Sequence, residues 1–129
     1  MKARTAELRA EGRRGAKQAE GLEALLDSIA KMAPGDRALA EGVHAVVSVS
    51  APQLLPKTWY GMPAYTNADG KVVFAFKNAG KFKQRYSSLE FQDAAHLDDG
   101  EIWPVGFALT TWTPAVQKRV AALVKAAAS

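Results

Sequence analysis

The chain has no cysteine, only two histidines and no long apolar run among its 129 residues. The lack of cysteine excludes disulfides, a thiolate nucleophile and cysteine-ligated zinc, and it fits a reducing compartment. No stretch approaches the roughly 18 apolar residues of a membrane-spanning helix. The N-terminus also lacks the apolar segment of a secretory signal. We therefore expect a cytoplasmic protein without a membrane partner.

The common catalytic motifs are absent as well. The chain has no G-x-S-x-G elbow for a nucleophilic serine and no glycine-rich loop that could cradle a phosphate. A site with two histidines and one carboxylate would need both His44 and His96. The sequence thus indicates no catalytic residue, and we expect a protein that is not an enzyme.

Positive charge is concentrated at the N-terminus. The chain has 17 basic and 13 acidic side chains, and residues 1–17 contain six of the basic and two of the acidic ones. The rest of the chain therefore has 11 basic and 11 acidic side chains. This segment is rich in Ala, Arg, Glu and Lys, which favours helix, but Leu8 is its only large apolar residue after Met1. A helix without an apolar stripe gains little from packing. We predict a basic, partly helical arm over residues 1–20, followed by one domain over residues 21–129.

Apolar spacing within the domain predicts two helices, a run of strands and a last helix. Helical stripes occupy residues 22–32 and 39–47, and Thr113-Pro114 is a typical helix start. The intervening strands are expected at residues 57–66, 71–77, 81–86 and 102–112, with a hairpin turn over residues 67–70. Residues 81–86 also fit a helix, and this alternative stays open. The predicted fold is a two-layer α+β sandwich of order α-α-β-β-β-β-α, in which helices cover one face of an antiparallel sheet of four to five strands.

The run from Tyr60 to Tyr65, YGMPAY, resembles the hallmark of the YdhG-like domain family. The resemblance covers about residues 22–126, and the stretch KFKQRYSSLEFQDAAHLDDGEIWP is similar to the longer-loop branch of that family. It implies a frataxin-like α+β fold. It also implies, by analogy of fold alone, iron binding and delivery to iron–sulfur assembly proteins.

The aromatic segment of residues 59–65 has two interpretations. Aromatic side chains in a strand usually belong to the core. Alternatively, Gly61 allows a ligand to approach the backbone closely and Pro63 indicates a bulge or a sheet edge. The candidate ligand-binding residues of this segment and of the basic stretch that follows are Trp59, Tyr60, Met62, Tyr65, Lys83 and Arg85.

Two groups of acidic side chains are candidate iron ligands, because hard cations take carboxylate oxygens and imidazole also suits iron. Both groups have an ordinary explanation, namely the solvated outer face of a helix and a polar loop. An EF-hand loop starting at Asp93 is excluded, since Ala95 and Leu97 stand where oxygen ligands are needed. The first group consists of Glu20, Glu23 and Asp27, and the second of Asp93, His96, Asp98, Asp99 and Glu101.

A basic sheet face is the last candidate. If residues 81–86 form a strand, their cations share a face with those of the preceding strand, and the arm adds its own charge. The alternative function is therefore an interaction protein that binds nucleic acid or another polyanion. The cations concerned are Lys71, Lys77, Lys81, Lys83 and Arg85.

Overall fold

The computed structural model describes the backbone of residues 2–129 and the side chains of residues 15–129. Within the described backbone there are four helices and five strands. The helices are α1 (Lys2–Ala30), α2 (Pro34–Ser50), α3 (Ala79–Phe82) and α4 (Pro114–Ala128). The strands are β1 (Leu55–Trp59), β2 (Met62–Thr66), β3 (Val72–Lys77), β4 (Ser87–Phe91) and β5 (Gly106–Leu109).

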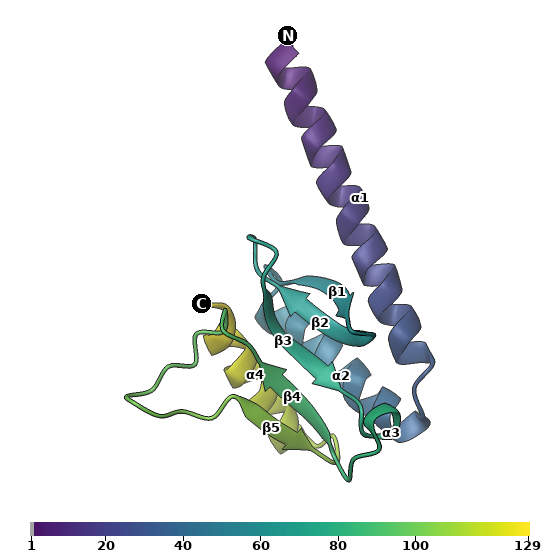
Figure 1. The fold of residues 1–129 in the computed structure, drawn as a ribbon, viewed down its shortest axis with the longest axis vertical. Coiled ribbons are helices and arrows are strands. Elements are labelled where there is room, and N and C mark those ends of the chain that lie inside the picture. Colours follow the sequence, from purple (N-terminus) through teal and green to yellow (C-terminus); the bar gives the residue numbers. More distant parts are fainter. Residues whose placement is uncertain (1) are drawn as a thin grey trace.

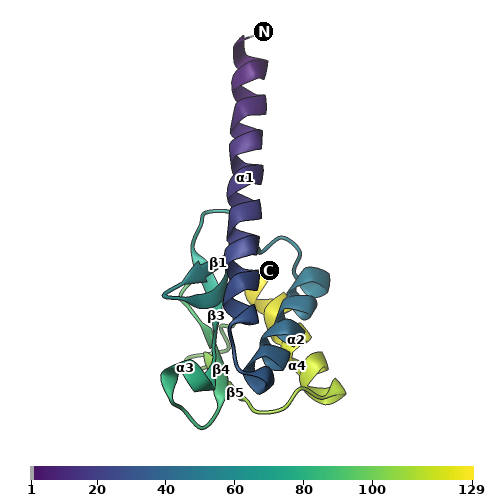
Figure 2. The ribbon, with the colours of Figure 1, turned by 90° about the vertical axis from the view of Figure 1, so that its right-hand side faces the viewer.

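The strands form one antiparallel sheet in the order of the sequence, β1-β2-β3-β4-β5. Helices α1, α2 and α4 lie on one side of this sheet (Figures 1 and 2). Below, the side of the sheet that faces these helices is called the helix face, and the other side is called the outer face. The predicted two-layer α+β sandwich is confirmed.

Helix α1 departs from the expected partly helical arm. It runs without interruption from Lys2 to Ala30, and its N-terminal part extends away from the sheet (Figures 1 and 2). The N-terminal segment is rich in Ala, Glu and Lys, which have high helix propensity. The helical turns that contain Leu25 and Ile29 are buried against the sheet, and the N-terminal segment extends this helix, which costs less than starting a new one. The separation into an arm of residues 1–20 and a domain of residues 21–129 stays a prediction.

Residues 57–66 do not form one strand. They form the hairpin of β1 and β2, in which Trp59 pairs with Met62 across a turn of Tyr60 and Gly61. Both turn residues have positive φ, 52° for Tyr60 and 75° for Gly61, as a type I′ turn requires. The predicted bulge or edge is therefore a reversal of the chain. The second hairpin turn, over residues 67–70, is confirmed, because the side-chain oxygen of Asn67 accepts hydrogen bonds from the backbone of Asp69 and Lys71.

The strand expected over residues 81–86 is also corrected. Helix α3 ends at Phe82, Lys83 adopts the left-handed conformation, and β4 begins only at Ser87. The N–H of Lys83 closes α3 on the carbonyl of Ala79. The last predicted strand is shorter than expected, since β5 occupies residues 106–109 of the range 102–112.

The core lies between the helix face and the helices. Its sheet side is formed by five side chains that are at most 4% exposed, Tyr65, Phe74, Phe76, Leu89 and Phe91. The final helix starts as predicted, with the Thr113 hydroxyl accepting a hydrogen bond from the N–H of Val116. Among the described residues, no helix has the length and apolar character needed to cross a membrane.

Candidate ligand-binding cleft

A cleft of about 800 Å³ opens where the C-terminal end of α1, the β1–β2 turn and α3 meet. Helix α1 contributes Asp27, and Lys31 follows directly after it. The turn contributes Gly61, and the segment around α3 contributes Asn78 and Lys81. These residues lie far apart in the sequence, and the folding of the hairpin and of α1 over β1 brings them together.

The start of α3 is capped by side chains from other elements. Asp36, in the first turn of α2, accepts a hydrogen bond from the N–H of Gly80 at 2.9 Å. The Ser87 hydroxyl accepts one from the N–H of Ala79 at 3.0 Å and donates to the other Asp36 oxygen at 3.3 Å. Asp36 and Ser87 thus take over the capping that Asn78, the N-cap residue, usually performs with its own side chain.

Asn78 is left with an unused side chain beside the cleft. The residue is 6% exposed, and its Oδ1 has no hydrogen-bond partner. A buried carboxamide normally has its hydrogen bonds satisfied, and an unsatisfied group costs about 1–3 kcal/mol. The terminal torsion of Asn is soft, so rotation can turn either the oxygen or the nitrogen toward the cleft. After such a rotation this carboxamide can offer a ligand either an acceptor or a donor.

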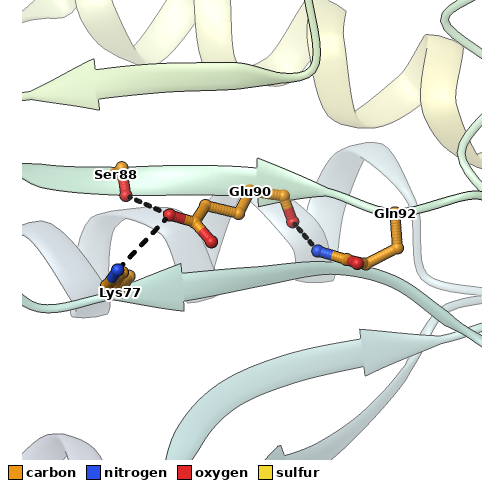
Figure 3. Close-up of polar contacts among 4 residues, drawn as sticks. All are labelled: Lys77, Ser88, Glu90 and Gln92. Carbon is orange, nitrogen blue, oxygen red and sulfur yellow. Dashed lines mark hydrogen bonds and ion pairs between the residues drawn. The ribbon is translucent and has the colours of Figure 1, made fainter.

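The cleft also carries charges of both signs. Asp27, Lys31 and Lys81 are exposed at its walls. Among the side chains that the structure describes, the single ion pair is Lys77–Glu90, on the outer face of the sheet (Figure 3). The Lys81 ammonium is held by one hydrogen bond of 3.3 Å to the carbonyl of Tyr60. Asp27 and the two lysines are thus not paired with each other, and the second acid of the lining, Asp36, is bound to Gly80 and Ser87.

The candidate ligand residues of the aromatic segment are not brought together. Tyr65 is 1% exposed in the core, and its hydroxyl lies 2.9 Å from Nδ1 of His44. Met62 is buried on the outer face beside a half-buried Trp59. Tyr60 is 80% exposed at the tip of the turn. Of this segment, Gly61 lines the cleft, and it is the position that was expected to let a ligand approach; Thr58, just before the segment, lines the cleft as well.

The candidate iron ligands lie in separate places. Asp27 lines the cleft, whereas Glu20 and Glu23 are exposed on α1. His96 contacts the end of α4, because its backbone N–H donates to the carbonyl of Ala127 and its ring Nδ1 contacts the backbone oxygen of Ser129. Asp93, Asp98, Asp99 and Glu101 are exposed. No three His, Asp or Glu side chains of residues 15–129 gather into a possible metal site.

The five cations of the predicted basic sheet face do not lie on two adjacent strands. Lys81 lies in α3 and Lys83 ends it, while Arg85 is in the connection to β4. Lys77 is on β3, where its ammonium faces Glu90 at 3.9 Å and the Phe82 ring at 5.0 Å. This surface was conditional on a strand over residues 81–86, and without that strand it does not form.

Sequence reasoning did not identify Asn78, Asp36 or Lys81 as members of one site. In the sequence, Asn78 before Ala79-Gly80 is typical of a turn and Asp36 of the first turn of a helix, and both patterns describe the local backbone only. A site of this kind is recognised when a helix start with its own N-cap residue, here Asn78, is capped by other side chains, here Ser87 and Asp36. The proximity of these three residues is known only from the folded structure.

No family model matches the chain, and comparisons with curated proteins and with solved structures also find no match. The resemblance to the YdhG-like family therefore rests on the run YGMPAY and its surroundings, and it stays a prediction.

Proposed function

We propose that this protein is a non-enzymatic binding module whose cleft takes a small zwitterionic molecule, such as a free amino acid. The observation that carries the proposal is the buried carboxamide of Asn78, which lines the cleft and has an oxygen without a partner. Buried polar groups without partners are rare and are often completed by a ligand or a water molecule.

The charges around Asn78 favour a zwitterion over a simple ion. Lys31 and Lys81 can hold a carboxylate, and Asp27 can hold an ammonium group. A molecule with one charge only would leave cations or an acid of the cleft without compensation. The carboxamide of Asn78 can pair with a polar group of the ligand as an acceptor or as a donor.

A thermal-shift screen with the common L-amino acids tests this proposal, because a ligand that binds only the folded state raises its stability. N-acetylated amino acid amides, which lack both charges, are the matched control probes and should give no shift. Asn78→Leu should abolish the shift without lowering the melting temperature, since it removes an unsatisfied buried group. A protein that no amino acid stabilises, or an Asn78→Leu variant that unfolds at clearly lower temperature, would overturn the proposal.

The carrier version of the function has iron as its cargo, as the YdhG-like and frataxin-like resemblance implies. Asp27 supports it, because it is the one candidate iron ligand that lines the cleft. Fe²⁺ should then be retained on desalting, and Asp27→Asn should reduce retention while Asp99→Asn, in the exposed loop, should not. Equal retention by both variants, or none by the unaltered protein, would contradict this version.

The second candidate function is binding of nucleic acid or another polyanion through α1. It is favoured by the six basic residues of residues 1–17 and by the extension of this helix away from the sheet (Figures 1 and 2). Binding to DNA or heparin should weaken steeply with salt, since each neutralised phosphate releases counterions. Deleting residues 1–17 should flatten the salt dependence and leave cooperative unfolding intact. Binding that ignores salt would exclude this candidate.

A further inference from the structure

The free edge of β5 exposes backbone hydrogen-bonding groups. The N–H of Phe91 donates to the carbonyl of Val105 at 2.8 Å, and the register continues with Leu89 opposite Phe107 and Ser87 opposite Leu109. In an antiparallel ladder, hydrogen-bonded pairs alternate with pairs that are not hydrogen-bonded. Gly106 and Ala108 therefore direct their N–H and C=O groups away from β4, to the side where the described chain places no further strand.

A groove of about 310 Å³ runs between this strand and α4. Phe107 and Leu109 form its strand side, while Val116 and Leu123 form its helix side. Gly106 and Ala108 are exposed beside it. A strand that paired with Gly106 and Ala108 would place the residue opposite Phe107 on the same face as Phe107, next to the groove.

A single cation stands at this groove. The Arg119 guanidinium lies 5.9 Å from the centre of the Phe107 ring, on the surface of α4. Arg119 has no carboxylate within ion-pair distance among the side chains that the structure describes. A carboxylate on an incoming segment would complete it, and a guanidinium binds carboxylates in a planar, bidentate manner.

We propose that β5 and α4 form a docking site for an extended peptide with an apolar and an acidic residue two positions apart, which share one face of the strand, and that this peptide adds to the sheet as a sixth strand. The backbone of the peptide pairs with Gly106 and Ala108, and its apolar side chain enters the groove beside Phe107. An acidic side chain reaches Arg119. This is strand addition, in which backbone hydrogen bonds supply affinity and the groove supplies specificity.

A peptide fits these observations better than a second copy of the chain. Pairing of two β5 strands around a two-fold axis would bring the Arg119 groups of both copies to one interface, where like charges repel. In such a dimer the side chains available to fill the groove of one copy would be Phe107 and Leu109 of the other copy. These side chains already pack against α4 of their own chain. The edge available for pairing is short, because Pro104 has no N–H to donate just before β5.

The test uses the acetylated hexapeptide TLTETL, whose Leu and Glu side chains share one face, and the full chain, with binding followed by isothermal titration and by NMR of the β5 amides. Ala108→Pro should abolish binding, since its N–H points to the free edge and does not hold β5 to β4. Arg119→Ala should weaken binding about tenfold, the effect of losing about 1.5 kcal/mol for a hydrogen bond to a charged group.

Two matched pairs keep the test decisive even if Ala108→Pro does not fold. Arg119→Glu should lose TLTETL and bind the charge-reversed peptide TLTKTL instead. A version of TLTETL with proline at its third residue should not bind, because the N–H of that residue pairs with β5. Absence of TLTETL binding, binding that shifts no β5 amide, or a dimer that forms through β5 without peptide would each overturn the proposal.

Discussion

The two faces of the sheet are built differently. The helix face carries three stacked or tilted aromatic side chains in adjacent strands, Tyr65, Phe74 and Phe91, with ring centres 4.9 and 5.2 Å apart. The outer face places Ala64 beside Ala75, and both are fully buried although they are small. Trp59 and Phe82 pack at the margin of this small cluster.

The difference shows where the fold obtains its stability. Large side chains between sheet and helices remove much more apolar area from water than alanines do, so the helix face dominates the free energy of folding. The outer face has a thin apolar layer and a surface ion pair instead. The same side of the sheet as the helices also carries the groove at β5, so the proposed peptide would extend the stronger layer.

The largest expected effect comes from opening a cavity on the helix face. Phe74→Ala should lower the free energy of unfolding by about 3–5 kcal/mol, because Phe74 is fully buried and the surrounding core cannot close the gap. Val72→Ala is the matched control on the outer face, where Val72 is half-buried. It should cost about 1 kcal/mol, given roughly 0.8 kcal/mol per buried CH₂. Urea unfolding of both variants measures the difference, and equal costs would refute the contrast between the faces.

Packing of α1 against β1 gives the next effect. A Cβ at Gly21 would lie 2.4 Å from the carbonyl oxygen of Pro56, whereas one at Gly15, in the same helix, would meet nothing within 4 Å. Gly21→Ala should therefore destabilise the protein by about 1–3 kcal/mol, because backbone must move. Gly15→Ala should stabilise it by up to about 1 kcal/mol through helix propensity. Thermal unfolding of the two variants should give shifts of opposite sign, and shifts of the same sign would contradict this close approach.

These effects indicate which parts of the structure could be predicted from the sequence. Periodicity found the core of α2 and α4, and turn chemistry found the Asn67 hairpin and the Thr113 cap. The residue pattern did not predict the β1–β2 turn, because this turn has Tyr60 at a position where Asn or Asp is usual. Phe82 and Tyr86 alternate with lysines as in a strand, yet Phe82 lies in α3 and packs beside the outer-face cluster. Here tertiary packing overrides a pattern that is only a few residues long.

The candidate cleft was less predictable than the fold, for a physical reason. Its members gain their roles from long-range contacts, such as that of Asp36 with Gly80 across 44 residues. Acid clusters in the sequence, by contrast, proved to be dispersed over exposed surface in the described part of the chain. Local spacing reveals helix faces and turns, but it does not show which capping side chain is displaced by another.

A pH effect tests the one polar contact within the aromatic layer. Burial lowers the pKa of His44 below its ordinary value near 6.5, and burial raises the pKa of the Tyr65 hydroxyl, which stays protonated 2.9 Å from Nδ1 of His44. Below about pH 6.5 the unfolded chain therefore binds a proton at His44 more readily than the folded chain does. The free energy of unfolding consequently decreases as the pH is lowered through this range. His44→Gln should reduce this loss between about pH 7.5 and about pH 5 in urea unfolding. An unchanged pH slope in the variant would show that other groups cause it.

The smallest effect belongs to the outer face, at the ion pair in Figure 3. The Lys77 ammonium lies 3.9 Å from Glu90, whose carboxylate also accepts a hydrogen bond from the Ser88 hydroxyl at 3.2 Å. The side chains of Lys77 and Glu90 remain 24% and 42% exposed, so water screens their attraction. A double-mutant cycle of Lys77→Met and Glu90→Gln should give a coupling free energy below about 1 kcal/mol that decreases further in high salt. A coupling as large as the Phe74→Ala effect would mean that polar contacts on the outer face stabilise the sheet as much as the aromatic core does.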